Sequence, residues 1–117
     1  MSIAEPQSST PLFEIETRPE RSRIVVTPRG ELDLATVGRL ERSVGEVLAR
    51  GFTAVLLDLR ELAFIDSSGL RLLLRLEAAA ARGGWSFAVN ADSGPAARLL
   101  ALTRMASRFN ADTTTTA

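Results

Sequence analysis

The strongest constraint on the fold is a nearly continuous apolar run in the middle of the chain, Thr53–Leu59. Such a run is typical of a strand that is buried on both faces inside a sheet. Apolar residues at helical spacings of three and four precede it: Val37, Leu40, Val44, Val47 and Leu48. This pattern predicts an amphipathic helix that ends before Gly51. Because a helix leads directly into the buried strand, the strand should pair in parallel with an earlier one.

Two short strands are predicted upstream. Leu12–Glu16 alternates between apolar and polar residues, and Arg23–Thr27 is rich in β-branched residues. The polar segment Arg18–Ser22 lies between them as a turn. The sequence therefore predicts an antiparallel hairpin at the N-terminal end of the domain.

The second half of the chain repeats the alternation of helix and strand. A helix is expected from Leu70 to about Arg82, where Gly83 and Gly84 follow, and a strand at Trp85–Val89. Pro95 fits the first turn of a third helix that reaches about Thr103. The order ββαβαβα predicts the α/β class, with a small mixed β-sheet that combines the hairpin with parallel βαβ crossovers.

The chain of 117 residues has the length of one domain. We place the folded domain at residues 12–111, and we expect flexible tails at residues 1–11 and 112–117, which are rich in Ser and Thr. Neither a long apolar run nor a secretory signal is present in the sequence. We therefore predict a cytoplasmic protein with no membrane insertion.

Composition argues against several classes of function. The chain has no His, no Cys and no Lys, so it lacks the usual general bases and metal ligands, and we assign no catalytic residue, cofactor or metal. Fourteen basic residues balance fourteen acidic ones, which argues against direct nucleic-acid binding. A serine hydrolase would need a base and a Gly-x-Ser-x-Gly elbow, and a nucleotide-binding enzyme would need a Gly-rich loop. We predict that the protein is not an enzyme.

The segment with the most chemical potential is Asp66-Ser67-Ser68-Gly69, at the mouth of the second helix. Its simplest interpretation is an N-cap, since Asp and Ser accept hydrogen bonds from free first-turn amides. The functional interpretation is that one hydroxyl is a phosphate acceptor, because a helix N-terminus tolerates a phosphate. A phosphoserine adds about −1.5 to −2 charges beside Asp66, so a partner docked there would be repelled.

Three residues of the same helix are candidates for a partner surface. Leu70, Arg71 and Leu74 lie three, four and seven residues after Ser67 and share its face if Ser67 is in the first turn. Core packing is the competing interpretation for the two leucines. The apolar arc of this helix is wider than a core-facing stripe needs, so one flank can remain available for docking.

A second constellation, Gly30-Glu31-Leu32-Asp33, also lies where a strand gives way to a helix. Two such junctions can meet at one edge of a sheet. We predict that Asp33 caps the first helix and, in addition, helps to shape a polar pocket beside Ser67.

Taken together, these motifs resemble the STAS domain family, and specifically its bacterial anti-sigma factor antagonists. The resemblance rests on Gly30-Glu31-Leu32-Asp33, on Leu56-Leu57-Asp58-Leu59 and on Phe64-Ile65-Asp66-Ser67-Ser68-Gly69-Leu70, and it covers about Leu12 to Phe109. It implies a mixed sheet with helices packed on one side. The chain departs from the family pattern at Arg104–Phe109, where the family usually has a Gly-Leu turn and an apolar last helix.

The resemblance also implies a partner-switching function in the regulation of transcription. An unmodified antagonist binds an anti-sigma factor that is also a serine kinase, is phosphorylated by it and is released, and a PP2C-type serine phosphatase resets it. The family's phosphate acceptor maps onto Ser67, with Ser68 the weaker candidate and Asp33 and Asp66 flanking it. The alternative is a STAS-domain subunit of a lipid-transport or stress-signalling complex that acts as a non-switching interaction module.

Overall fold

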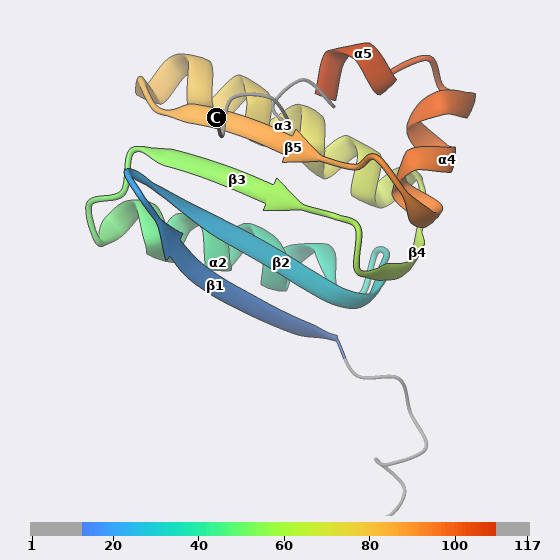
Figure 1. The fold of residues 1–117 in the computed structure, drawn as a ribbon, viewed down its shortest axis with the longest axis horizontal. Helices are drawn as coiled ribbons and strands as arrows, with labels where there is room; N and C mark the ends of the chain where they lie inside the picture. The colour runs from blue at the N-terminus through green and yellow to red at the C-terminus, as the bar shows by residue number, and fades with distance from the viewer. Residues whose placement is uncertain (1–12, 110–117) are drawn as a thin grey trace, which may run out of the picture.

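The computed structural model describes residues 13–109, and the expected tails lie outside this range. The elements, in chain order, are β1 (Glu14–Glu20), β2 (Arg23–Leu32), α2 (Val37–Ala49), β3 (Ala54–Asp58), β4 (Leu62–Ile65), α3 (Ser67–Gly83), β5 (Ser86–Asn90), α4 (Gly94–Leu102) and α5 (Ala106–Phe109). They form one mixed α/β unit, shown in Figure 1. Helices and strands alternate as predicted, with one additional strand and one additional short helix.

The sheet has the predicted pairing. Its strands lie in the order β1-β2-β3-β5, with β1 antiparallel to β2 and the pairs β2–β3 and β3–β5 parallel. The hairpin and both parallel crossovers are therefore confirmed. Because β2, β3 and β5 run in the same direction, their carboxyl ends lie at the same edge of the sheet.

The hairpin turn is tighter than the sequence indicated. Glu20 pairs with Arg23, so only two residues connect the strands, and Arg21 adopts a left-handed conformation with φ 60°. The predicted turn at Arg18–Ser22 was too long, because the polar residues at its start belong to an exposed strand. The carboxylate of Glu20 accepts hydrogen bonds from Arg23 Nε at 3.2 Å and Nη2 at 2.8 Å. Leu12, the predicted first strand residue, lies outside the described range.

Strand β4 was absent from the sequence prediction. It pairs in parallel with the end of β2, beyond the part of β2 that contacts β3, and a register shift at Gly30/Glu31 separates the two regions. Leu62 and Ile65 are buried, whereas Ala63 and Phe64 are exposed. This strand carries the chain directly to the start of α3.

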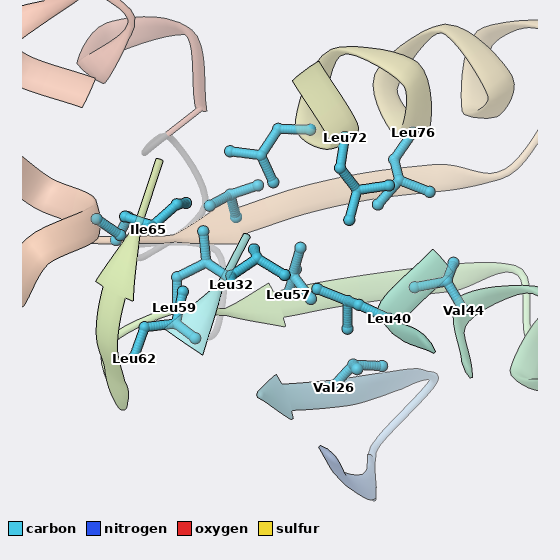
Figure 2. Packing of buried hydrophobic residues seen from close by; sticks show 14 of the residues in the cluster. Val26, Leu32, Leu40, Val44, Leu57, Leu59, Leu62, Ile65, Leu72 and Leu76 are labelled. Carbon is cyan, nitrogen blue, oxygen red and sulfur yellow. The ribbon is translucent and has the colours of Figure 1, made fainter. Parts of the chain in front are cut away.

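The core lies between the sheet and the helices, which pack on one of its faces (Figure 2). Val26 and Leu57 contribute the sheet side of the core. Helix α2 contributes Leu40, Val44 and Val47, and helix α3 contributes Leu72, Leu73 and Leu76. None of the helices between residues 13 and 109 is long and apolar enough to cross a membrane.

The opposite face of the sheet is polar. Val25 and Leu56 are neighbours across β2 and β3, and because side chains alternate along a strand they lie on the face away from Val26 and Leu57. Charged side chains on this face form ion pairs, including Arg29 with Glu16 at 2.8 Å and Arg60 with Asp58 at 3.0 Å. Val25 and Leu56 are nonetheless 2% and 7% exposed.

Helices α4 and α5 form the last part of the chain that the structure describes. After α4 the backbone turns at Arg104, which has φ 63°, and the short helix α5 follows. Phe109, the last residue of α5, is only 4% exposed and belongs to the core. The segment that departs from the family pattern therefore still supplies an apolar anchor for the last helix.

Candidate functional site

The two strand-to-helix junctions meet at the carboxyl edge of the sheet. Leu32 at the end of β2 pairs with Ile65 at the end of β4, and the amide of Asp66 donates a hydrogen bond to the carbonyl of Leu32 at 3.3 Å. Asp33 and Asp66 follow these paired residues directly. The short strand β4 thus places the two acidic positions beside each other, as the sequence analysis expected of the junctions.

Asp66 is the N-cap of α3. Its backbone is extended, with φ −122° and ψ −166°, and its Oδ1 accepts a hydrogen bond from the amide of Ser68 at 2.9 Å. Helix α3 begins at Ser67, earlier than the predicted start at Leu70, because this cap already satisfies a first-turn amide. Ser67 is consequently the first residue of the helix.

Gly69 allows the first turn of α3 to lie against the strand ends. A Cβ at this position would be 2.6 Å from Ile65 Cγ1 and 3.1 Å from Leu32 Cδ2. The first of these distances is shorter than Cβ atoms show in real structures. Any side chain here would push the helix away from β2 and β4, so Gly69 fixes the position of the neighbouring serines.

The two hydroxyl residues differ in accessibility. Ser67 is exposed, whereas Ser68 is partly buried. Within the part of the chain that the structure describes, the Ser67 hydroxyl forms no hydrogen bond, and the capping function is carried by Asp66. The Ser67 hydroxyl therefore has no role in holding the fold and is open to solvent.

The prediction that Asp33 caps the first helix is wrong. Helix α2 begins only at Val37, and its N-cap is Thr36. Asp33 instead holds the turn before the helix, where its Oδ1 accepts a hydrogen bond from the amide of Ala35 at 3.0 Å and its carbonyl accepts from Thr36 and Val37. A turn therefore precedes α2, because the Asp33 carboxylate accepts from the amide of Ala35 within this turn and not from an amide of the first turn of the helix.

The candidate partner residues lie on one flank of α3. Arg71 is exposed, while Leu70 and Leu74 are partly buried and pack against the core. The deeper apolar residues of the helix, Leu72, Leu73 and Leu76, fill the core instead. Core packing of the two leucines is therefore confirmed in part, and each also keeps some accessible surface. Their function as a partner surface stays a prediction.

Two exposed apolar residues near the site were not singled out by the sequence analysis. Leu34, which follows Asp33, is 79% exposed, and Phe64, which precedes Ile65 on β4, is 44% exposed. Leu34 lies three residues before Val37 and continues the helical spacing, so its sequence position indicates burial. It is exposed because the helix starts after it, in a turn that does not share the buried face of α2.

No metal site accompanies these carboxylates: among residues 13–109, no group of three acidic side chains lies close enough to hold an ion. Asp33 and Asp66, together with the exposed Arg71, instead give the protein a charged surface near the accessible hydroxyl of Ser67. Chemically, Ser67 can accept a phosphoryl group without disturbance of buried structure, and the phosphate would change the charge of this surface.

One family model and two curated proteins match the sequence of this chain. Residues 15–109 match the family described as "Mlab, STAS domain". Two curated proteins named anti-sigma-F factor antagonist RsfB, from two strains of Mycobacterium tuberculosis, are 43% identical over 49 residues. This match covers 42% of the chain and 40% of each relative, so it spans less than half of the relatives' length.

Solved structures resemble the whole described unit. An anti-sigma factor antagonist from Mycobacterium paratuberculosis is 28% identical with a TM-score of 0.68, and the match covers 84% of this chain and 83% of that one. SpoIIAA in its unphosphorylated form and the Bacillus SpoIIAA in its phosphorylated form are each 21% identical, with TM-scores of 0.64 and 0.59. The matches cover 82% of this chain and 84% and 86% of those chains, and they show the same fold.

Proposed function

Because this chain belongs to the STAS domain family, we propose that it acts as an anti-sigma factor antagonist that is switched off by phosphorylation of Ser67. In its unmodified form it binds an anti-sigma factor, which releases a sigma factor for transcription. The proposal is supported by relatives that carry the name anti-sigma factor antagonist over a local sequence match and over most of the fold. Its role is that of a non-enzymatic binding protein in the cytoplasm.

The observation that carries the proposal is the accessible hydroxyl of Ser67 at the start of α3. Since Asp66 provides the cap, Ser67 is free to be modified without loss of a structural hydrogen bond. A serine kinase would transfer the γ-phosphoryl group of ATP to Ser67 Oγ, with release of ADP and of the hydroxyl proton. A PP2C-type phosphatase would hydrolyse the phosphoester and restore the serine.

The surface around Ser67 explains how a phosphate would end binding. Leu34 and Phe64 supply exposed apolar area, Leu70 and Leu74 supply partly exposed area, and Arg71 supplies a positive charge. We infer that this set forms the docking surface for the anti-sigma factor. A dianionic group on Ser67 introduces bulk and negative charge next to Asp66, which a closely packed partner cannot accommodate.

The first experiment tests the modification. The purified protein is incubated with ATP and candidate anti-sigma kinases, and intact mass is measured for wild type, Ser67→Ala and Ser68→Ala. We expect one phosphate on wild type and on Ser68→Ala and none on Ser67→Ala. A phosphate that persists on Ser67→Ala and disappears from Ser68→Ala would transfer the acceptor role to Ser68. Absence of phosphate with every candidate kinase would favour the non-switching STAS subunit.

The second experiment tests the switch by titration calorimetry with the kinase that phosphorylates the protein. Ser67→Ala should bind like the unmodified wild type, and Ser67→Asp should bind at least about tenfold more weakly, which is about 1.4 kcal/mol. Ser86→Asp is the matched control, because it adds the same charge at the opposite end of the sheet, on the exposed start of β5. Equal affinities of Ser67→Asp and Ser86→Asp would contradict the switch.

A further inference from the structure

Arg71 lies over the first turn of α3. It follows Ser67 by one helical turn, at the i,i+4 spacing that brings side chains together on one face. Side chains of a helix lean toward its N-terminus, so a side chain as long as that of Arg71 can reach the turn that begins at Ser67. Both residues are exposed.

Arg71 also forms no ion pair within residues 13–109. Two other arginines on or beside α3 form ion pairs: Arg75 pairs with Glu41 of α2 at 3.0 Å, and Arg108 pairs with Glu77 at 2.6 Å. The nearest acid in the sequence, Asp66, directs its Oδ1 to the amide of Ser68. Arg71 is therefore a cation near the site that no structural ion pair uses.

On the premise that Ser67 is phosphorylated, we propose that Arg71 is the intramolecular ligand of the phosphoryl group. The planar guanidinium can donate two parallel hydrogen bonds to phosphate oxygens, a geometry that lysine cannot reproduce. Phosphorylation then changes the docking surface in two ways, because it adds negative charge at Ser67 and withdraws the positive charge of Arg71 from the partner.

The surrounding charges make this contact measurable. Asp66 precedes Ser67, and Asp33 occupies the neighbouring position at the end of β2, so both acids disfavour the dianionic form of the phosphate. Arg71 and the N-terminus of α3 favour that form. Removal of Arg71 leaves the acids and the helix unchanged, and the second pKa of the phosphate should therefore rise.

The test uses full-length protein with phosphoserine incorporated at position 67 during translation, so that no kinase is needed. The second pKa of the phosphate is measured by phosphorus NMR in the phosphorylated wild type, in R71Q and in the control R82Q. Arg82 is an exposed arginine in the last turn of the same helix. We expect R71Q to raise this pKa by about 0.5 unit and R82Q to leave it within about 0.1 unit.

Two further observations sharpen the result. R71K should keep part of the effect, because it retains the charge but not the paired hydrogen bonds, and the difference between wild type and R71Q should shrink in 1 M salt. Equal phosphate pKa values in wild type and R71Q would overturn the proposed contact. This result would leave the proposed function intact, since the function fails only if kinases do not modify Ser67 or if modification does not weaken binding.

Discussion

At Gly69, the absence of a side chain decides how closely α3 approaches the sheet. A Cβ would lie 2.6 Å from Cγ1 and 2.8 Å from Cδ1 of Ile65. We expect Gly69→Ala to lower the free energy of unfolding by about 2 kcal/mol, because either Ile65 leaves its rotamer or the helix shifts. Urea unfolding followed by circular dichroism measures this change.

Gly45→Ala is the matched control for that substitution. Gly45 lies within α2, and a Cβ there would have no neighbour within 4 Å. This variant should be more stable than wild type by about 0.5–1 kcal/mol, since alanine favours the helix. A Gly69→Ala protein that is as stable as Gly45→Ala would show that the junction can absorb a methyl group, and Gly69 would lose its positioning role.

Asp58 interacts with Arg60, and the contribution of this ion pair to stability can be tested through the pKa of Asp58. Burial raises the pKa of its carboxyl group, but hydrogen bonds from the side chain and backbone of Arg60 outweigh this effect and hold the pKa below its usual value of 3.8. Because the pKa of Asp58 is lower in the folded state, the ionised carboxylate stabilises the protein at pH values above the unfolded-state pKa. This contribution is lost as the pH falls through the folded-state pKa.

We therefore expect Asp58→Asn to lower the free energy of unfolding by about 1–2 kcal/mol at pH 7, a value reduced by the partial exposure of Arg60. The difference between wild type and variant should shrink as the pH falls below about 4 and Asp58 of the wild type becomes protonated. Chemical unfolding at a series of pH values tests this. A difference that stays constant over this range would mean that the ion pair with Arg60 is not the source of the stability.

Among the secondary-structure elements, α3 depends on its N-cap for the place at which it starts. Asp66→Ala removes the acceptor for the amide of Ser68 and should lower the free energy of unfolding by about 1 kcal/mol. Asp66→Asn should retain most of the stability, because asparagine is an equally good cap. Amide hydrogen exchange at Ser68 and Gly69 should be faster in Asp66→Ala only. Equal exchange rates in the two variants would argue against the cap.

The elements also show what could be predicted from the sequence. Long periodic segments such as α2 and the apolar strand β3 were recognised, because amphipathic spacing and continuous burial leave a clear pattern. Strand β4 was missed because four residues are too few for a pattern, and its buried ends Leu62 and Ile65 enclose two exposed residues. Its pairing depends on a register shift in β2, which no local signal announces.

At the site, the same limits apply. The position of Ser67 and Asp66 at a helix start was predictable, because capping is a local property. The true start of α2 and the exposure of Leu34 were not, since a helical spacing continues through the turn that Asp33 stabilises. Boundaries of this kind depend on which of two local hydrogen-bond patterns the tertiary structure favours.

At the scale of the whole molecule, the site lies at the carboxyl edge of the sheet, where Ser67 is exposed although the first turn of its helix packs against the core residues Leu32 and Ile65. The parallel strands bring both junctions to one edge, while the core residues Val26, Leu57 and Leu76 lie between the sheet and the helices (Figure 2). A group added to the exposed Ser67 hydroxyl contacts solvent and the first turn of α3. The modification should therefore alter one surface and leave the packing unchanged.

We therefore predict that phosphorylation of Ser67 does not unfold the domain. In nitrogen-15 correlation spectra, the phosphorylated and unmodified proteins should differ at Asp33–Thr36 and Asp66–Leu74, while residues in the centre of the sheet, such as Val25 and Leu56, keep their chemical shifts. The free energy of unfolding should change by no more than about 0.5 kcal/mol, because a negative charge at a helix N-terminus is favourable and the nearby acids oppose it. Shifts that extend through β3 and β5 would instead mean that the phosphate acts on the core, and release of the partner would then follow from a change of the whole fold rather than from a change in surface charge.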